Sequence, residues 1–292
     1  MAVEFLQERI RKLKNPSMLE LALSVDDLPP SFQAGILTAA DGYGKYCLEL
    51  LSGLKGTIPG VRVSFSAFAL LGREGLEALS QVLRFASEEG YYVLLDAPEI
   101  LSQAAAVRTA EALLGADSKF PCDGLVISGY LGSDVIKPFL HHCKEGKKDI
   151  FVVARTPNRS APELQDLLAG GRLVHMAAAD HVNRYGADTL QKCGYTRVGL
   201  LAAANAANSL KNIRAKYPKL FLIVDGYDAP NANAKNCAAA FDQLGHGAAV
   251  CAGGYIAAAW KSAGTDGADY MEQAKAAAER MKKNLCRYTT VL

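Results

Sequence analysis

The sequence has no apolar run approaching the ~20 residues that a membrane span needs. It also has no marked excess of either charge, because 32 Lys and Arg residues stand against 30 Asp and Glu residues. Proteins that bind nucleic acid or an anionic membrane usually carry a basic surface, so we expect neither partner. Residues 1–9 place acidic side chains inside an amphipathic pattern, which is not the pattern of a secretion signal.

The sequence contains no CxxC pair, although it has seven cysteines. Their number is odd and they are scattered along the chain, at Cys47, Cys122, Cys143, Cys193, Cys237, Cys251 and Cys286. This pattern is typical of free thiols in a reducing compartment rather than of a disulfide framework or a metal site. We therefore expect a cytoplasmic protein without a bound metal ion.

No glycine-rich phosphate fingerprint follows the first predicted strand, which disfavours a doubly wound open sheet without excluding it. Eight strand-like segments instead alternate with helical patterns, and no linker interrupts them. The predicted strands cover 19–25, 61–68, 91–95, 124–130, 150–154, 198–204, 220–224 and 248–251. The predicted helices cover 1–14, 43–54, 72–89, a segment ending at 114, 134–143, 161–168, 174–185, 209–216, 234–244 and 267–285. The order predicts one (β/α)8 TIM-barrel domain over residues 1–292, with an N-terminal helix at 1–14 and a closing helix at 267–285.

In such a barrel the residues at the carboxyl ends of the strands face the active site. The candidates on this criterion are Asp26, Arg62, Ser64, Asp96, Ser128, Arg155, Thr156, Asp225, Asp228, Gly253 and Gly254. Asp96 is the central candidate, because it is the first polar side chain after a fully apolar strand. Two other interpretations of Asp96 remain open. It could cap the following helix, as Pro98 suggests, or form an acid pair with Glu99.

One segment resembles a known family. Residues 151–167, FVVARTPNRSAPELQDL, are similar to the fifth-strand motif of the longer-chain orotidine 5′-phosphate decarboxylases. Weaker similarities occur in order at Leu95–Ala97, Ser128–Gly132 and Gly226-Tyr227, so the resemblance covers nearly the whole chain. It implies a TIM barrel and a dimer. It also implies that Arg155 and Thr156 serve mainly as scaffold at the barrel mouth.

The resemblance also shows which catalytic groups this chain lacks. The family converts orotidine 5′-phosphate to uridine 5′-phosphate without a metal or organic cofactor. It uses a lysine from strand two and a D-x-K-x-x-D motif after strand three. Matched to that pattern, this chain retains Asp96 but has Pro98 at the lysine position, Leu101 at the second aspartate and Arg62 at the strand-two lysine. Proline cannot donate a proton, and Lys119 lies beyond the following helix.

The residues that would hold the substrate phosphate differ as well. The family's G-A-Q-G-G loop reads Asp228-Ala229-Pro230-Asn231-Ala232 after Tyr227, and its strand-eight S-R-G reads Gly253-Gly254-Tyr255. Losing the Gln and the Arg while gaining Asp228 disfavours a dianion. Asp225, Asp228 and Tyr255 would better suit a neutral or cationic ligand, although the glycine pair could still offer backbone amides to a small anion.

Three hypotheses follow from these residues. The preferred one is a decarboxylase-like barrel that has lost decarboxylation, survives in a binding or regulatory role with a small-molecule ligand, and forms a homodimer. The second is an enzyme of altered chemistry that uses Asp96 and Arg62 on another substrate. The third is a working decarboxylase whose lysine comes from another part of the chain.

Overall fold

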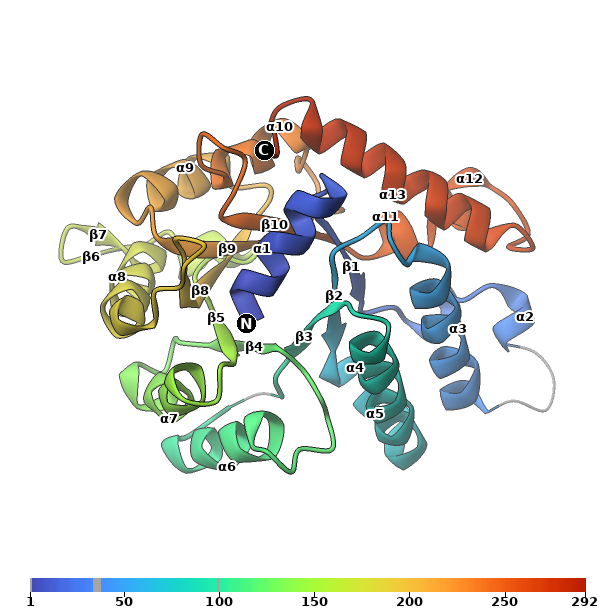
Figure 1. Ribbon diagram of the computed structural model, residues 1–292, viewed down its shortest axis with the longest axis horizontal. Coiled ribbons are helices and arrows are strands. Elements are labelled where there is room, and N and C mark those ends of the chain that lie inside the picture. The colour runs from blue at the N-terminus through green and yellow to red at the C-terminus, as the bar shows by residue number, and fades with distance from the viewer. Residues whose placement is uncertain (1, 34–37, 99) are drawn as a thin grey trace.

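The computed structural model describes residues 2–33, 38–98 and 100–292, and in them eight parallel strands close into a barrel (Figure 1). The strands follow the spatial order β1-β10-β9-β8-β5-β4-β3-β2. Their bounds are Ser17–Leu21 (β1), Gly60–Ser64 (β2), Tyr92–Asp96 (β3), Gly124–Ser128 (β4), Asp149–Val153 (β5), Thr196–Ala203 (β8), Leu220–Asp225 (β9) and Ala248–Ala252 (β10). The predicted TIM barrel is confirmed.

The apolar runs of the sequence become strands that are buried on both faces. In β3, Tyr92 and Leu94 point into the barrel, whereas Val93 and Leu95 pack against the surrounding helices. The helix-facing core and the barrel interior are therefore two separate hydrophobic clusters, and alternate residues of each strand belong to one or the other.

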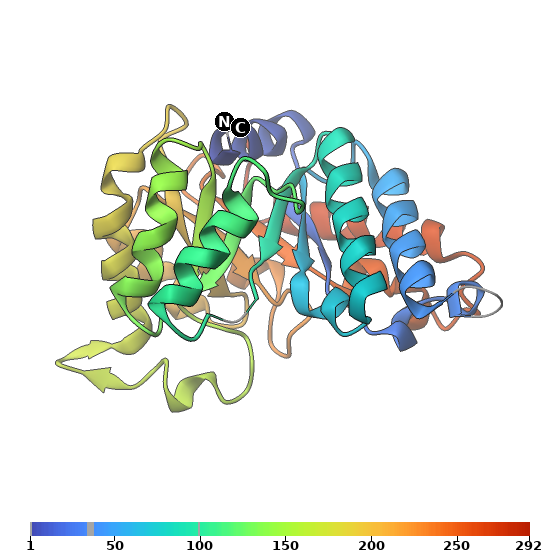
Figure 2. The same cartoon turned by 90° about the horizontal axis from the view of Figure 1, so that it is seen from below.

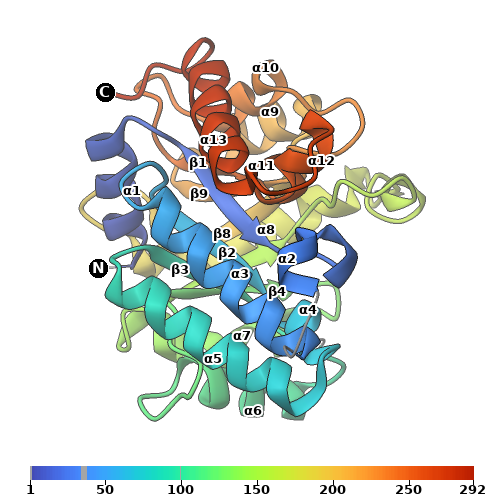
Figure 3. The same ribbon diagram turned by 90° about the vertical axis from the view of Figure 1, so that its right-hand side faces the viewer.

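Helices surround the barrel, and α3 and α5 lie side by side on its outer face (Figure 3). The helix bounds are Ala2–Leu13 (α1), Pro30–Gln33 (α2), Ala39–Leu54 (α3), Phe65–Ala69 (α4), Gly72–Glu88 (α5), Gln103–Leu114 (α6), Ser133–Lys144 (α7), Val174–Gly186 (α8), Ala207–Lys216 (α9), Ala234–Cys237 (α10), Gly254–Ala257 (α11), Ala259–Ala263 (α12) and Tyr270–Cys286 (α13). No helix in these described residues is long and apolar enough to cross a membrane.

Helix α1 closes the amino-terminal end of the barrel. Its buried side chains Val3, Leu6 and Ile10 belong to the same cluster as the barrel-interior residues Met18 and Phe151. Both chain termini lie at this end, and the hairpin that follows β5 projects from the opposite end (Figure 2). Apolar side chains thus fill most of this end of the barrel, together with a buried polar group in which Asp149 accepts a hydrogen bond from the Tyr92 hydroxyl at 2.9 Å and lies 3.6 Å from Arg197. The predicted site residues at the strand ends lie at the opposite, carboxyl-terminal mouth.

The predicted helix at 161–168 is wrong. Ala161–Glu163 forms a single 3-10 turn, and Leu168–Ala169 (β6) pairs antiparallel with Arg172–Leu173 (β7) in a two-stranded hairpin. Gly170 and Gly171 form its turn with positive φ angles, which residues with a side chain adopt at a cost. The pair of glycines was therefore the signal for a hairpin.

Several predicted boundaries also move. The strand at 61–68 stops at Ser64, because the Ser64 hydroxyl accepts a hydrogen bond from the Ala67 amide and caps α4. The first strand begins at Ser17 and ends at Leu21, and Val25–Asp27 forms a 3-10 turn. The helix predicted at 234–244 is reduced to α10 and a 3-10 turn at Ala238–Ala240, while the closing helix begins at Tyr270 rather than at 267.

Candidate functional site

Arg62 lies at the centre of a charged cluster in the barrel mouth. Its Nε donates to Asp96 Oδ1 at 2.8 Å, and its Nη1 lies 2.6 Å from Asp225 Oδ1 and 3.1 Å from Glu20 Oε1. The Arg62 side chain is only 9% exposed, so these carboxylates replace most of its water. One guanidinium therefore binds three carboxylates from three different strands.

Strand register explains why these side chains meet. Glu20 on β1 lies directly beside Arg62 on β2, and Asp96 is the last residue of β3, which is the next strand round the barrel. Asp225 ends β9, farther round the closed sheet on the far side of β1 and β10. A long arginine can reach all three carboxylates because they project into the same barrel interior near the mouth.

Burial makes this cluster electrostatically costly. Desolvation raises the pKa of Glu20 to about 7, although Arg62 opposes the shift. Desolvation likewise raises the pKa of Asp96, again against the attraction of Arg62. Burial alone would lower the pKa of Arg62, but Asp225, Asp96 and Glu20 raise it well above its usual value. The arginine is therefore always charged, while Glu20 and Asp96 hold protons more readily than free carboxyl groups.

Asp228 occupies a second position at the mouth. Its Oδ2 accepts hydrogen bonds from the Gly253 amide at 3.0 Å and the Tyr255 amide at 3.1 Å, at the start of α11. Burial raises the pKa of Asp228, and these backbone hydrogen bonds act against that shift. The amides that the sequence offered to a small anion thus already bind a carboxylate of the same chain.

The structure brings together only part of the predicted set. Arg62, Asp96 and Asp225 are in direct contact, and Asp228 meets Gly253 beside the Glu20 side chain. Asp26 is exposed on a 3-10 turn after β1, and the structure gives it no ion pair with any described residue. Glu20, the fourth residue of β1, occupies the place in the cluster that was expected for Asp26.

The two predicted serines have local partners. Ser64, at the end of β2, is buried and lies 3.1 Å from the Ser66 hydroxyl while it caps α4. Ser128 ends β4, is exposed, and accepts a long hydrogen bond of 3.5 Å from the Tyr130 amide. Neither hydroxyl contacts the Arg62 cluster in the described part of the chain.

Arg155 and Thr156 hold the loop after β5 together. Arg155 binds both oxygens of Asp166, at 3.0 and 3.1 Å, in a bidentate ion pair. The Thr156 amide donates to Gln165 Oε1 at 2.8 Å. Asp166 also lies 3.2 Å from Nδ1 of the buried His175, so the motif residues form one network under the loop. This geometry favours the scaffold role.

Asp96 does not cap the following helix. Ser102 caps α6 instead, by accepting a hydrogen bond from the Ala105 amide at 3.1 Å, so the capping interpretation is wrong. Leu101, at the position of the family's second aspartate, is 73% exposed. The proposed acid pair of Asp96 with Glu99 lies outside the described residues.

Glu20 is the site residue that sequence reasoning missed. It stands in the run Ser17-Met18-Leu19-Glu20-Leu21, where its neighbours are apolar and buried. An acidic residue between apolar residues in a buried strand points to the opposite face of the sheet from its two neighbours. Once buried there, it needs a positively charged partner. That signal was present in the sequence and would have identified Glu20.

The cluster contains neither a lysine nor a set of metal ligands. Among the described residues, the ion pairs of Glu20, Asp96 and Asp225 all involve Arg62. No group of three or more His, Cys, Asp or Glu side chains in this part of the chain is placed to hold a metal ion. The site is thus an arginine–carboxylate network.

The chain is similar in sequence to known decarboxylases. No family model matches it. The orotidine 5′-phosphate decarboxylase of Rhodopirellula baltica is 29% identical over 256 residues, which cover 85% of each chain. That of Clostridium perfringens is 26% identical over 266 residues, or 91% of each chain.

Solved structures share the fold. The Leishmania donovani OMP decarboxylase superimposes with a TM-score of 0.77 at 22% identity and covers 99% of both chains. The Plasmodium berghei orotidine 5′-monophosphate decarboxylase gives 0.77 at 13% identity, with 98% of both chains covered. The TM-scores show that the chain shares the fold of these structures, and the similarity in sequence comes from the curated relatives. The chain is therefore an orotidine 5′-phosphate decarboxylase-like (β/α)8 barrel.

Proposed function

We propose that the chain belongs to the orotidine 5′-phosphate decarboxylase family and has lost decarboxylation, keeping the barrel for a binding or regulatory role. The observation that supports this proposal most directly is that an arginine, Arg62, lies at the centre of the charged cluster in the barrel mouth. Arg62 binds Asp96, Asp225 and Glu20 where the resemblance leads one to expect a lysine-based network. This substitution keeps a positive charge and removes a group that can transfer a proton.

Loss of chemistry follows from the properties of these groups. Release of CO2 leaves a carbanion that a nearby cation must stabilise and an acid must protonate. Arg62 has a pKa well above its usual value, so it cannot serve as that acid. Pro98 has no side-chain proton, and the described residues place no lysine in an ion pair with Asp96.

Substrate binding is also disfavoured. Asp228 fills the amide pair of Gly253 and Tyr255 with its own carboxylate, so a phosphate dianion would have to displace it. Glu20, Asp96 and Asp225 add acidic groups to the same mouth. We infer that the physiological ligand is a neutral or cationic small molecule, because Coulomb repulsion opposes an anion here.

The predicted homodimer forms part of the proposal. Large exposed side chains follow four neighbouring strands at the mouth: Leu70 after β2, Leu101 after β3, Leu131 after β4 and Leu168 after β5. Exposed apolar residues gathered at one end of a barrel support an interface with a second copy. The cytoplasmic location stays a prediction.

An assay of orotidine 5′-phosphate decarboxylation tests the loss. The purified protein is expected to give no uridine 5′-phosphate above the uncatalysed background, while the Clostridium perfringens relative, run in parallel, gives rapid turnover. A thermal-shift screen with amines, neutral metabolites and nucleotides then tests the ligand class, and a rise in Tm with amines or neutral compounds supports it. Turnover of orotidine 5′-phosphate would overturn the proposal, and turnover of a newly found ligand would favour the altered enzyme.

A further inference from the structure

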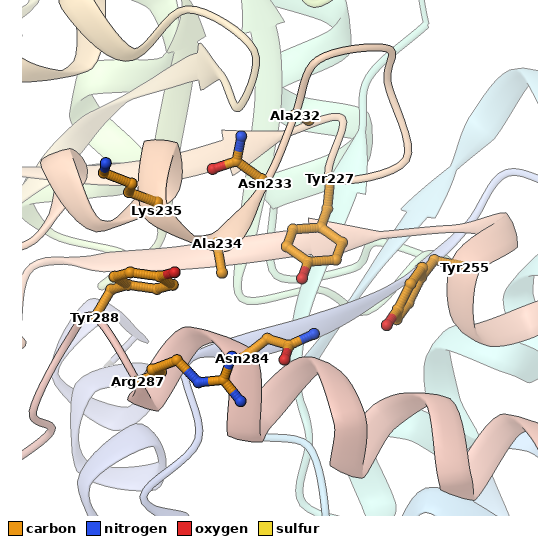
Figure 4. Close-up of a pocket in the computed structure, with 9 residues that line it drawn as sticks. All are labelled: Tyr227, Ala232, Asn233, Ala234, Lys235, Tyr255, Asn284, Arg287 and Tyr288. Atoms are coloured by element: carbon orange, nitrogen blue, oxygen red, sulfur yellow. The ribbon is translucent and has the colours of Figure 1, made fainter.

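A hollow of about 490 Å³ lies on the outer side of the barrel, between α10, α11 and the end of α13 (Figure 4). This volume lies within the ~300–1,000 Å³ range of small-molecule sites. The side chains that decide its chemistry are Tyr227, Tyr255, Tyr288, Lys235, Asn284 and Arg287. None of the residues of the Arg62 cluster lines it, so the hollow is a separate site.

The short helix α10 accounts for the hollow. Other connections between neighbouring strands place longer helices against the barrel, such as α7 with twelve residues and α9 with ten. Helix α10 has four residues and continues only as a 3-10 turn. It cannot cover the whole length of the neighbouring strands, and tyrosines from the loops after β9 and β10 line the remaining space.

The hollow carries positive charge without a counter-ion. Lys235 projects from α10 and Arg287 follows α13, and neither side chain has an ion pair or hydrogen bond with any residue that the structure describes. Neither Asp nor Glu is among the described residues that line the hollow. A third cation, Arg280, donates to the Tyr255 hydroxyl at 3.3 Å. Two unpaired cations in an acid-free hollow favour an anion.

The aromatic side chains add a second requirement. The Tyr227 and Tyr255 rings meet edge to face, with centroids 5.2 Å apart and planes at 82°. Tyr288 is 50% exposed and lies across the hollow from this pair, next to Arg287 (Figure 4). An exposed tyrosine ring beside a guanidinium can stack on a flat ligand, while Asn284 offers both a donor and an acceptor.

We propose that this hollow, defined by Tyr227, Tyr255, Tyr288, Lys235, Asn284 and Arg287, binds a small anion that carries a flat ring. Lys235 and Arg287 hold the anionic group, and Tyr288 stacks on the ring. An aromatic carboxylate and a ring-bearing phosphate monoester share this chemistry. The inference does not depend on the loss of decarboxylation, because no residue of the Arg62 cluster lines the hollow, and Tyr255 contributes only its backbone amide to the mouth and its ring to the hollow.

Titration calorimetry with phenyl phosphate, benzoate and inorganic phosphate tests the proposal. Phenyl phosphate or benzoate is expected to bind, whereas inorganic phosphate binds at least about tenfold more weakly, a difference of ~1.4 kcal/mol. Stronger binding of phenyl phosphate identifies phosphate monoesters as the natural class, and stronger binding of benzoate identifies carboxylates. The absence of heat with both ring-bearing probes at millimolar concentration would overturn the proposal.

Three variants assign the binding to the hollow. Arg287→Ala is expected to weaken the ring-bearing probe about tenfold or more, and Tyr288→Ala to weaken it without changing binding of inorganic phosphate. Lys275→Ala removes an exposed lysine of the same helix α13 that does not line the hollow, so its affinity should equal that of the wild type. Equal affinities of the wild type, Arg287→Ala and Lys275→Ala would show that the probe binds elsewhere and refute the assignment.

Discussion

Replacement of Glu20 by glutamine should stabilise the protein at alkaline pH and change its stability little at acid pH. The Glu20 side chain is 17% exposed, and burial outweighs the attraction of Arg62, so the pKa of the carboxyl rises from 4.5 to about 7. The ionised form is thus disfavoured in the folded state even with its arginine partner present. Glutamine keeps the shape of the side chain and cannot ionise.

The sign follows from the two pKa values. The unfolded chain loses this proton near pH 4.5, and the folded protein retains it until about pH 7. The contribution of Glu20 is therefore fully present below the lower pKa and is lost as the pH rises through the higher one. A shift of this size corresponds to a loss of about 3 kcal/mol at pH 8 and less than ~1 kcal/mol at pH 5. Glu20→Gln should recover these amounts.

Urea unfolding at about pH 5 and about pH 8, followed by the fluorescence of the single tryptophan, Trp260, measures the free energy of unfolding of each protein. Asp26→Asn is the matched control, because Asp26 is an exposed acid in the segment after β1, and its effect should stay within ~0.5 kcal/mol at both pH values. If Glu20→Gln destabilised the protein equally at both pH values, the ion pair with Arg62 would outweigh burial and the reasoning would fail.

Three further predictions concern buried or partly buried polar groups. Arg62→Met should cost ~3–5 kcal/mol near neutral pH because three carboxylates lose their cation. The control Arg73→Met alters an arginine that is 81% exposed, and equal urea midpoints for the two variants would contradict the prediction. Asp228→Ala frees the Gly253 amide, so inorganic phosphate should bind to the variant more tightly than to the wild type in an NMR titration; equal binding would show that the carboxylate is not the obstacle. Arg214→Met should cost roughly 3–5 kcal/mol, since Arg214 donates to the carbonyls of residues 218, 220, 240 and 247; an unchanged Tm would refute this.

The barrel could be predicted from the sequence because its signal is local. Each strand is a short apolar run, and the alternation of such runs with amphipathic segments restricts the architecture to very few choices. The meeting of Arg62 with Asp96 could also be anticipated, since both stand near the ends of adjacent strands. Whether either residue acts on a ligand stays a prediction.

The missed features depend on long-range packing. The length of α10 depends on how residues after Cys237 pack under the barrel, which the alanine-rich segment 238–240 does not specify. Similarly, the negative charge of Asp228 could be predicted to repel a phosphate. Its hydrogen bond with the Gly253 amide could not be predicted, because the two residues are 25 positions apart in the sequence. Glu20 is different, because its isolation in an apolar strand was a readable signal that the emphasis on strand ends overlooked.

The two polar sites described at the mouth, the Arg62 cluster and the amides at the start of α11, share one property: their polar groups already have partners within the chain. Arg62 is neutralised by carboxylates of β1, β3 and β9, and the amides at the start of α11 are satisfied by Asp228. A catalytic pocket leaves such groups unsatisfied until the substrate arrives, because that binding energy supports the reaction. Here an anionic substrate would first have to break contacts that stabilise the fold. The internal pairing therefore supports the proposal that this barrel keeps its architecture without decarboxylating orotidine 5′-phosphate.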